Sequence, residues 1–325
     1  MNILIAPNAF KNSLDAASVA AAIETGLLRS TLKCDCIRFP VGDGGDGTAE
    51  ILVQRFEGRK MSRKAQDPLG RTIGVEFGLI EENKTAVIEM ADVSGLKLLK
   101  GKELDPLHAT SFGTGELIRN ALDKQVKKII LCIGGSATVD GGTGALRALG
   151  IRFLDQGNNV LNSLPAELND LATIDLSALD KRIFNCEIVV LCDVENALLG
   201  EHGAAKIFGP QKGATEADVQ KLETALNQFC DIVLQQAGKD MASIRHGGAA
   251  GGIAASFATL LNAELVNGID YFLNITEFDK ALTETDLVIT GEGSIDEQTL
   301  RGKGPYGVAK RAKQKGVPVI ALAGR

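Results

Sequence analysis

Short apolar runs alternate with amphipathic segments at both ends of the chain. Residues 2–7 and 36–41 are apolar and predict strands, and apolar side chains recur between them at helical spacing. Residues 287–290 and 317–323 predict two more strands, separated by a helical segment near 308–313. This order of strand, helix and strand predicts a parallel, Rossmann-like sheet to which both ends of the chain contribute.

The pattern changes near residue 58. Residues 59–90 contain three strand-like stretches separated by two turn sequences, a spacing typical of antiparallel hairpins. Residues 128–133 and 187–191 predict further buried strands, and 116–123 a helix. We therefore predict an α/β fold of two domains: a discontinuous Rossmann-like domain of residues 1–58 and 286–325, and an inserted mixed α/β domain of residues 59–285.

Polar side chains mark several predicted helix starts. Ser13 is expected to cap the first helix, with Asp15 in its first turn. Thr215 and Thr276 each precede an acidic residue by three positions, which predicts a capping box before a long amphipathic helix and a cap before a shorter one.

The composition is that of a globular protein. The 325 residues are 45% hydrophobic and carry a net charge of −6, which excludes a disordered chain and argues against a general nucleic-acid binder. The six cysteines form no CxxC pair, and residues 1–10 have no basic leader, so we expect reduced thiols in a cytoplasmic protein. Residues 247–263 predict a glycine loop and a buried helix rather than a membrane span.

Glycine is unusually frequent, with 37 residues against 8 prolines, and many glycines follow predicted strands. Ligands bind beyond the carboxyl ends of strands in open α/β sheets, where glycine N–H groups and helix N-termini suit phosphate and carboxylates suit Mg²⁺. A single such glycine is more often a turn residue, but five loops of this kind favour phosphoryl transfer with ATP and Mg²⁺. The expected phosphate-binding residues are Gly44, Gly45, Gly134, Gly135, Ser136, Gly291 and Gly293, and the expected metal ligands are Asp43, Asp46 and Glu292.

Basic residues in the same kind of loop are candidates for binding anions. Lys11, Lys212 and Lys303 lie beside glycine or polar residues, and we expect them to meet phosphate or a substrate carboxylate. Arg71 is a candidate for the carboxylate, although its Pro-Leu-Gly-Arg turn could instead shape a hairpin.

A carboxylate is also needed as a catalytic base for a substrate hydroxyl, and Asp193 is the first candidate. It directly follows an apolar strand, although it could instead cap the next turn. Asp296 is the second candidate, and Lys11 is expected to assist catalysis.

Standard nucleotide motifs are absent or out of place. The chain has no GxxxxGK[ST] sequence. Residues 302–307 match GxGxxG literally, but they lie far after their strand and contain a proline, so they predict a loop. The three histidines are isolated, which argues against a Ser-His-Asp triad.

The motifs resemble those of the type-1 glycerate kinases over essentially the whole chain. The matching segments include APNAFKNSLDA (6–16), PVGDGGDGT (40–48), GGSATVDGG (134–142), FGPQKGA (208–214) and ITGEGSID (289–296). The resemblance implies ATP-dependent phosphorylation of D-glycerate, usually to 2-phosphoglycerate, on a two-domain α/β fold. A match at 90–96 adds Ser94 as a substrate-binding candidate, with an ordinary turn hydroxyl as the alternative.

This chain departs from the family pattern at several positions. The family usually has Asp and Ser at positions 8 and 9, Asn at 139 and Pro at 197, where this chain has Asn8, Ala9, Val139 and Ala197. Family members usually continue beyond the position of Arg325, so we expect either a truncated chain or a fold without the last elements. The alternatives are a non-catalytic nucleotide- or sugar-acid-binding protein and a nicotinamide-dependent oxidoreductase; a homodimer is a candidate assembly, and no membrane partner is expected.

Overall fold

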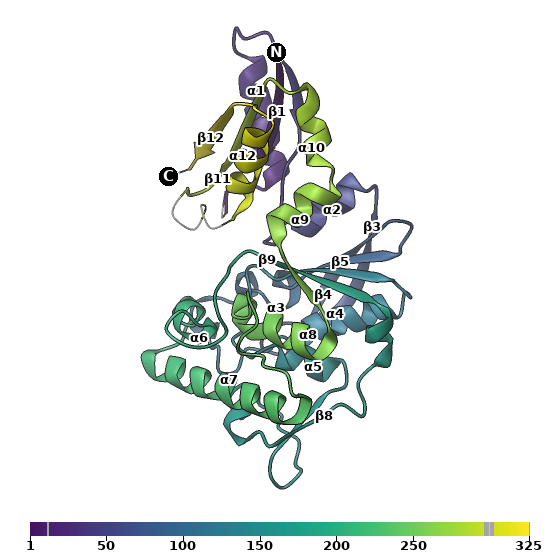
Figure 1. Cartoon of the computed structure of the whole chain (residues 1–325), viewed down its shortest axis with the longest axis vertical. Helices are drawn as coiled ribbons and strands as arrows, with labels where there is room; N and C mark the ends of the chain where they lie inside the picture. Colours follow the sequence, from purple (N-terminus) through teal and green to yellow (C-terminus); the bar gives the residue numbers. More distant parts are fainter. Residues whose placement is uncertain (12, 296–298, 300–301, 325) are drawn as a thin grey trace.

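Two separate sheets, shown one above the other in Figure 1, organise the chain. The structure, a computed structural model, describes residues 1–11, 13–295, 299 and 302–324. The smaller sheet is fully parallel, with the strand order β12-β11-β1-β2. Its strands are β1 (Asn2–Pro7), β2 (Asp35–Arg38), β11 (Leu287–Glu292) and β12 (Val319–Ala323). The prediction of a parallel sheet made from both chain ends is confirmed.

The connections that leave the two central strands, β1 and β11, run in opposite directions along the sheet. Helix α1 (Ala16–Leu28) connects β1 to β2 on one side, and α12 (Gly304–Gln314) connects β11 to β12 on the other. The centre pair is in register, with Pro7 opposite Gly291. Such a reversal opens a crevice at the carboxyl ends of the two strands, where open α/β sheets bind their ligands.

The larger sheet is mixed, with the order β10-β9-β6-β5-β4-β3. The meander from β3 to β5 is antiparallel, as the hairpin spacing predicts, and the other pairs are parallel. Its strands are β3 (Arg59–Gln66), β4 (Thr72–Ile80), β5 (Thr85–Glu89), β6 (Lys128–Cys132), β9 (Glu187–Cys192) and β10 (Glu264–Asn267). A separate small hairpin consists of β7 (Arg152–Leu154) and β8 (Thr173–Asp175).

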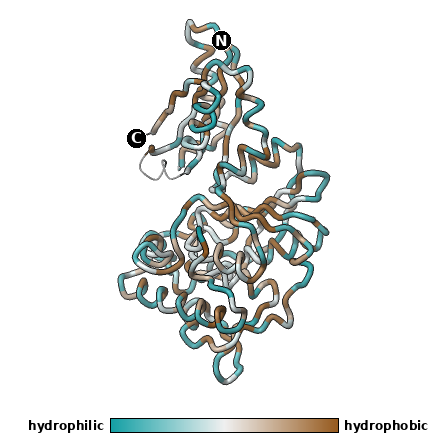
Figure 2. The backbone as a smooth tube through the Cα atoms, in the orientation of Figure 1, coloured by the Kyte–Doolittle hydropathy of each residue, from teal (hydrophilic) through white to brown (hydrophobic). Residues whose placement is uncertain are grey.

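Helices cover one face of the larger sheet and form its main core. The apolar central strands are brown in Figure 2, while the outer loops are mostly teal. The glycine segment at 247–252 leads into a buried helix, as predicted. The covering helices are α3 (Ala91–Ser94), α4 (Phe112–Leu122), α5 (Thr143–Ala148), α6 (Ala204–Phe208), α7 (Glu216–Ala237) and α8 (Ile253–Leu261).

A second core joins the two sheets. Helices α2 (Thr48–Arg55), α9 (Gly268–Ile275) and α10 (Phe278–Ala281) contribute side chains to it. Leu4 of β1 and Val189 of β9 belong to the same buried cluster, and Phe272 lies fully buried within it. The apolar layer between the sheets therefore sets how their carboxyl ends face each other. The predicted domain boundaries at residues 58/59 and 285/286 stay a prediction.

Two predicted helix caps are wrong, while the capping box at Thr215 is confirmed. Asp15, not Ser13, caps α1, because its carboxylate accepts from the Ser18 amide three residues on. Thr276 does not cap α10: its hydroxyl donates back to the Phe272 carbonyl inside the end of α9. Glu277 precedes α10 in a left-handed conformation.

The GxGxxG segment is not a loop throughout, because α12 begins at Gly304. Pro305, which argued against a helix in the sequence, lies in the first turn, where a missing N–H group costs no hydrogen bond. Strand β11 also continues further than predicted, so Gly291 and Glu292 belong to its ladder with β12 rather than to a loop.

All six cysteines are free thiols, and four of them are buried. Within the described ranges, no helix combines the length and the apolar character needed to cross a bilayer.

The core between the sheets can be tested by truncating Phe272. We expect Phe272→Ala to lower the free energy of unfolding by about 3–5 kcal/mol, because it leaves a cavity among fully packed side chains. Phe184→Ala is the matched control: this ring is 52% exposed, and its loss should cost less than about 0.5 kcal/mol. Urea unfolding of both variants measures the difference, and equal costs would contradict the packing described.

Candidate active site

The carboxylate of Asp43 connects three segments beyond the strand ends of the smaller sheet. Asp43 follows β2 and is 9% exposed. Its Oδ2 atom accepts from the Asn8 side-chain amide (2.8 Å) and from the Gly304 N–H (3.3 Å), and its Oδ1 atom accepts from the Gly45 N–H (3.2 Å). Asp43 therefore joins the end of β1, its own loop and the start of α12.

The same loop touches the strand ends of the larger sheet through its backbone. The Gly134 N–H, just past β6, donates to the Gly44 carbonyl (3.0 Å). A Cβ at Gly134 would lie 2.6 Å from the Gly45 Cα, and one at Gly44 would lie 2.8 Å from the Leu191 carbonyl of β9. Only glycine permits these approaches, and they bring the strand ends of both sheets together.

Asp193 lies directly after β9 and faces this junction. Its pKa is raised, chiefly by burial and then by the nearby charge of Asp43, while Lys11 and Lys303 act in the opposite direction. The residue is nevertheless partly exposed. We call the surroundings of its carboxylate, with Asp43, Lys11 and Lys303, the recess. We find no hydrogen bond from another described side chain to its carboxylate. Asp193 is therefore accessible, poorly hydrated and faced by two lysines.

Lys11 and Glu292 flank the recess from the smaller sheet. A Cβ at Gly293 would lie 3.3 Å from the Lys11 backbone nitrogen, which places the end of β11 beside the Lys11 loop. Glu292 is buried, accepts a hydrogen bond from Thr299 and feels the charge of Asp43. Burial and Asp43 raise the pKa of Glu292 against the opposing effects of Thr299, Lys303 and Lys11.

Lys212 approaches Asp193 from the larger sheet. It is 2% exposed, and its ammonium donates to the Ser136 hydroxyl (2.9 Å) and to the Thr138 carbonyl (2.7 Å). Burial lowers its pKa to about 7, against the charges of Asp140 and Asp193. Lys212 thus holds the loop after β6, and its predicted contact with substrate stays a prediction.

Carboxylates of the protein already occupy the N-termini of helices around the recess. Glu89 accepts from the Gly47 and Ala49 amides at the start of α2, at 3.1 and 2.7 Å. Asp140 accepts from two amides at the start of α5, and Asp43 from the first residue of α12. These carboxylates use the positive ends of the helices. The amides that donate to them are therefore not available to a bound anion.

The predicted phosphate-binding glycines differ in what their amides do. Gly44 donates to the Thr48 hydroxyl (3.1 Å) and Gly45 to Asp43, so both N–H groups are used within their own loop. Gly135 and Ser136, by contrast, have amides without a hydrogen-bond partner in the part of the chain that the structure describes. The loop at 134–136 is therefore the better candidate, and all of these assignments stay predictions.

Two other predicted site residues, Arg71 and Ser94, have partners within the protein. Arg71 pairs with Asp67 (2.5 Å) and Glu103 (2.6 Å), which supports its role in shaping the hairpin. Ser94 is fully buried, and its hydroxyl pairs with that of Thr114 at 2.9 Å. The substrate contacts of both stay predictions.

The predicted metal ligands do not form one compact group. Asp46 pairs with Lys97 at 3.1 Å, whereas Asp43 and Glu292 lie within electrostatic reach of each other. Among the described residues, no set of three His, Cys, Asp or Glu side chains is placed to hold a metal ion. Asp296, the second candidate base, lies outside the described residues.

Sequence reasoning missed Glu89 and the role of Asn8. Glu89 ends β5, the same strand-end position that makes the other acidic residues candidates. Asn8 departs from the family pattern, and its side-chain amide donates to Asp43.

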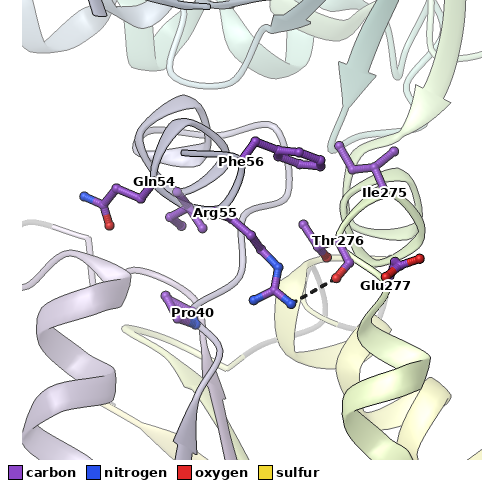
Figure 3. A pocket seen from close by; sticks show the side chains of 8 residues that line it. Pro40, Gln54, Arg55, Phe56, Ile275, Thr276 and Glu277 are labelled. Atoms are coloured by element: carbon purple, nitrogen blue, oxygen red, sulfur yellow. Dashed lines mark hydrogen bonds between the residues drawn. The ribbon is translucent and has the colours of Figure 1, made fainter. Parts of the chain in front are cut away.

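A cavity of 620 Å³ at the far ends of α2 and α9 does not coincide with this site (Figure 3). Arg55 donates to the Thr276 carbonyl there (3.0 Å), and its guanidinium stacks 3.7 Å from the Phe39 ring centroid. None of the predicted site residues lines it.

Comparisons with known proteins converge on one family. Residues 3–325 match the model of the glycerate kinase family. A glycerate kinase of Halalkalibacterium halodurans is 46% identical over 322 residues, covering 99% of this chain and 85% of that protein. A glycerate 2-kinase of Escherichia coli K12 is 42% identical over 324 residues, covering 100% and 85%. A crystal structure from Salmonella typhimurium LT2, described as a glycerate kinase 2, has a TM-score of 0.88 and 44% identity, covering 99% of this chain and 86% of that one.

The buried Glu89 should make stability depend on pH. Burial, the largest cause, and the charge of Asp92 raise its pKa to about 7 against two amide hydrogen bonds and Lys97, so the folded protein binds an extra proton between its ordinary pKa and 7. This extra proton adds to the free energy of unfolding. The contribution is complete below the ordinary pKa of glutamate and is lost as the pH rises through 7.

We expect Glu89→Gln, which does not titrate, to abolish this loss. From pH 5 to pH 8 the wild type should lose about 2–3 kcal/mol relative to the variant, at about 1.4 kcal/mol per pKa unit. Urea unfolding of both proteins at the two pH values measures the change. A difference that does not vary with pH would contradict the buried position of Glu89.

Proposed function

The chain belongs to the glycerate kinase family and is a kinase; from this premise we propose that it transfers the γ-phosphoryl group of ATP to D-glycerate. The observation that supports the proposal most strongly is the recess at Asp193, where a poorly hydrated carboxylate is faced by Lys11 and Lys303. We propose the 2-phosphate as product, supported by the name of the E. coli relative, a glycerate 2-kinase.

Asp193 is the proposed catalytic base. An alcohol gives up its proton only as the phosphoryl group arrives, so a carboxylate within hydrogen-bond reach must accept it. A raised pKa makes Asp193 a stronger base than an ordinary aspartate, while its position at the end of a buried strand fixes its backbone. Asp296 remains the second candidate.

Lysines are the proposed partners of the transferred phosphate. Lys11 and Lys303 bring positive charge to the recess from the smaller sheet, and Lys212 brings it from the larger sheet. The amides of Gly135 and Ser136 are proposed to add hydrogen bonds to phosphate oxygens. This arrangement compensates for helix N-termini that already hold carboxylates.

The donor set fits Mg²⁺. Asp43 raises the pKa of both Asp193 and Glu292, so negative charge is crowded at this point, and carboxylate oxygens are the ligands that Mg²⁺ prefers. Asp43 and Glu292 are the proposed ligands, with Asp46 a weaker candidate because of its ion pair with Lys97. When bound, Mg²⁺ would neutralise phosphate charge.

The other residues and properties predicted from the sequence remain proposals. Arg71 and Ser94 are retained as proposed contacts of the glycerate carboxylate, although both have protein partners. The cytoplasmic location and the homodimer stay predictions. A purely binding protein or a nicotinamide-dependent oxidoreductase is not favoured, because the family is one of kinases.

The proposed base predicts a specific loss of rate. Asp193→Asn keeps the size of the side chain but cannot accept the proton, so we expect kcat with glycerate and ATP to fall by about 10²–10⁴-fold. A coupled assay of ADP release measures kcat, and titration calorimetry checks that ADP still binds.

Asp231→Asn is the matched control, because Asp231 is exposed on α7, which lies on the side of the larger sheet away from the smaller one (Figure 1). It should retain wild-type kcat. A folded Asp193→Asn protein with nearly full kcat would remove Asp193 from the role and pass it to Asp296.

A further inference from the structure

A second cavity, of 530 Å³, adjoins the recess at Asp193. Residues after β9 and around β10 line one side, and the first turns of α12 line the other. Its volume is within the range of small-molecule sites. The cavity therefore lies between elements of the two sheets, and its lining contains none of the predicted catalytic residues.

Two lining residues of this cavity, His246 and Gly302, connect it to Asp193 and Lys303. His246 lines the cavity, and its Nδ1 atom donates to the carbonyl of Val194 (2.6 Å), the residue after Asp193. Gly302 lines the opposite side and directly precedes Lys303, whose charge acts on Asp193. The cavity therefore lies beside the backbone segments that carry the proposed base and one of its lysines.

Glycines of the GxGxxG segment form this wall by close packing. Gly302 has a φ of +103°, and a Cβ there would lie 2.9 Å from the Asn267 side chain. A Cβ at Gly307 would lie 2.6 Å from Ile269. The segment that the sequence predicted to be a loop therefore packs α12 directly against the start of α9.

The start of α12 is not available for phosphate, because the Gly304 N–H donates to Asp43 (3.3 Å). This arrangement differs from dinucleotide-binding folds, in which the glycine turn holds the pyrophosphate. The phosphates of a nucleotide are then left to the lysines of the recess. The adjoining cavity is left for the uncharged part of the same molecule.

The chemistry of the lining suits a nucleoside. Tyr306 is 40% exposed and presents an aromatic ring from the first turn of α12, and the apolar Leu265 and Ile269 also line the cavity. Asp270 offers carboxylate oxygens to hydroxyl groups, while Glu195 is paired with Arg245 at 2.5 Å. Stacking on an aromatic ring is a sequence-tolerant way to bind any nucleobase.

We propose that this cavity binds the base and ribose of the nucleotide, with the base on Tyr306 and the phosphates directed past Lys303 towards Asp193. The proposal rests on the proposed kinase function and adds the placement of its phosphoryl donor. It gives the GxGxxG segment a role in shaping a nucleoside site without contacting phosphate.

The chain offers a direct optical test, because it contains 2 tyrosines and no tryptophan. In a Tyr271→Phe protein, Tyr306 is the remaining tyrosine. We expect titration with ADP to change the tyrosine fluorescence until it saturates. The dissociation constant from this titration should equal the one from calorimetry. No change on saturation with ADP would overturn the proposal.

Substitution of Tyr306 tests the same point by affinity. Tyr306→Ala should weaken ADP binding and raise the KM for ATP by about 5- to 100-fold, the range expected for loss of one stacked base, while the KM for glycerate stays unchanged. Tyr306→Phe should retain tight binding. Phe184→Ala, which removes an exposed ring elsewhere, is the matched control and should bind ADP normally.

Failure of this placement and failure of the proposed function give different results. If Tyr306→Ala binds ADP as tightly as the wild type while the wild type phosphorylates glycerate, the placement is wrong and the function stands. If ADP binds through Tyr306 but glycerate is not phosphorylated, the placement is supported and the proposed substrate is wrong.

Discussion

The hydrogen bonds of the Asp43 carboxylate hold the rest of the site in place. One side chain accepts from the end of β1, from its own loop and from the first residue of α12. The loop that carries it also meets the ends of β6 and β9 through glycines without room for a side chain. Asp193 owes part of its raised pKa to the charge of Asp43 at this junction. Loss of the Asp43 contacts would therefore separate the groups that the proposed chemistry needs together.

The electrostatics of the site depend on which groups bind the backbone amides at the helix N-termini. Glu89, Asp140 and Asp43 each accept hydrogen bonds at the N-terminus of a helix. Those amides are not available to a phosphate. In the proposed mechanism the positive charge comes from Lys11 and Lys303, and from Mg²⁺ when it is bound, in contrast to P-loop proteins, where the backbone itself binds phosphate.

Much of the fold could be predicted from the sequence, because buried parallel strands leave continuous apolar runs such as 2–7 and 187–191. The prediction failed at element ends, where the outcome depends on tertiary contacts. Pro305 argued for a loop, yet it lies in the first turn of α12, and the Gly304 N–H before it donates to Asp43 of a distant loop.

The positions of some candidate site residues could also be predicted. The strand-end rule places Asp43 and Asp193 after the carboxyl ends of their strands, because it depends only on position along the chain, and their roles stay predictions. It could not show that Ser94 is fully buried or that the amides of Gly44 and Gly45 are used within their loop. The burial of Ser94 arises from tertiary packing, and the use of the two amides depends on the exact conformation of the loop, which the order of residues does not give.

The dependence of kcat/KM for glycerate on pH, compared between the wild type and Lys11→Met, tests the electrostatic account of the recess most directly. The acidic limb of this profile reports the pKa of the essential base in the free enzyme. Lys11 is exposed and acts to lower the pKa of Asp193, so its removal should move the acidic limb to higher pH in a protein that still folds. An acidic limb that stays at the same pH in the two proteins would contradict the account, because the base would then lie outside the reach of Lys11.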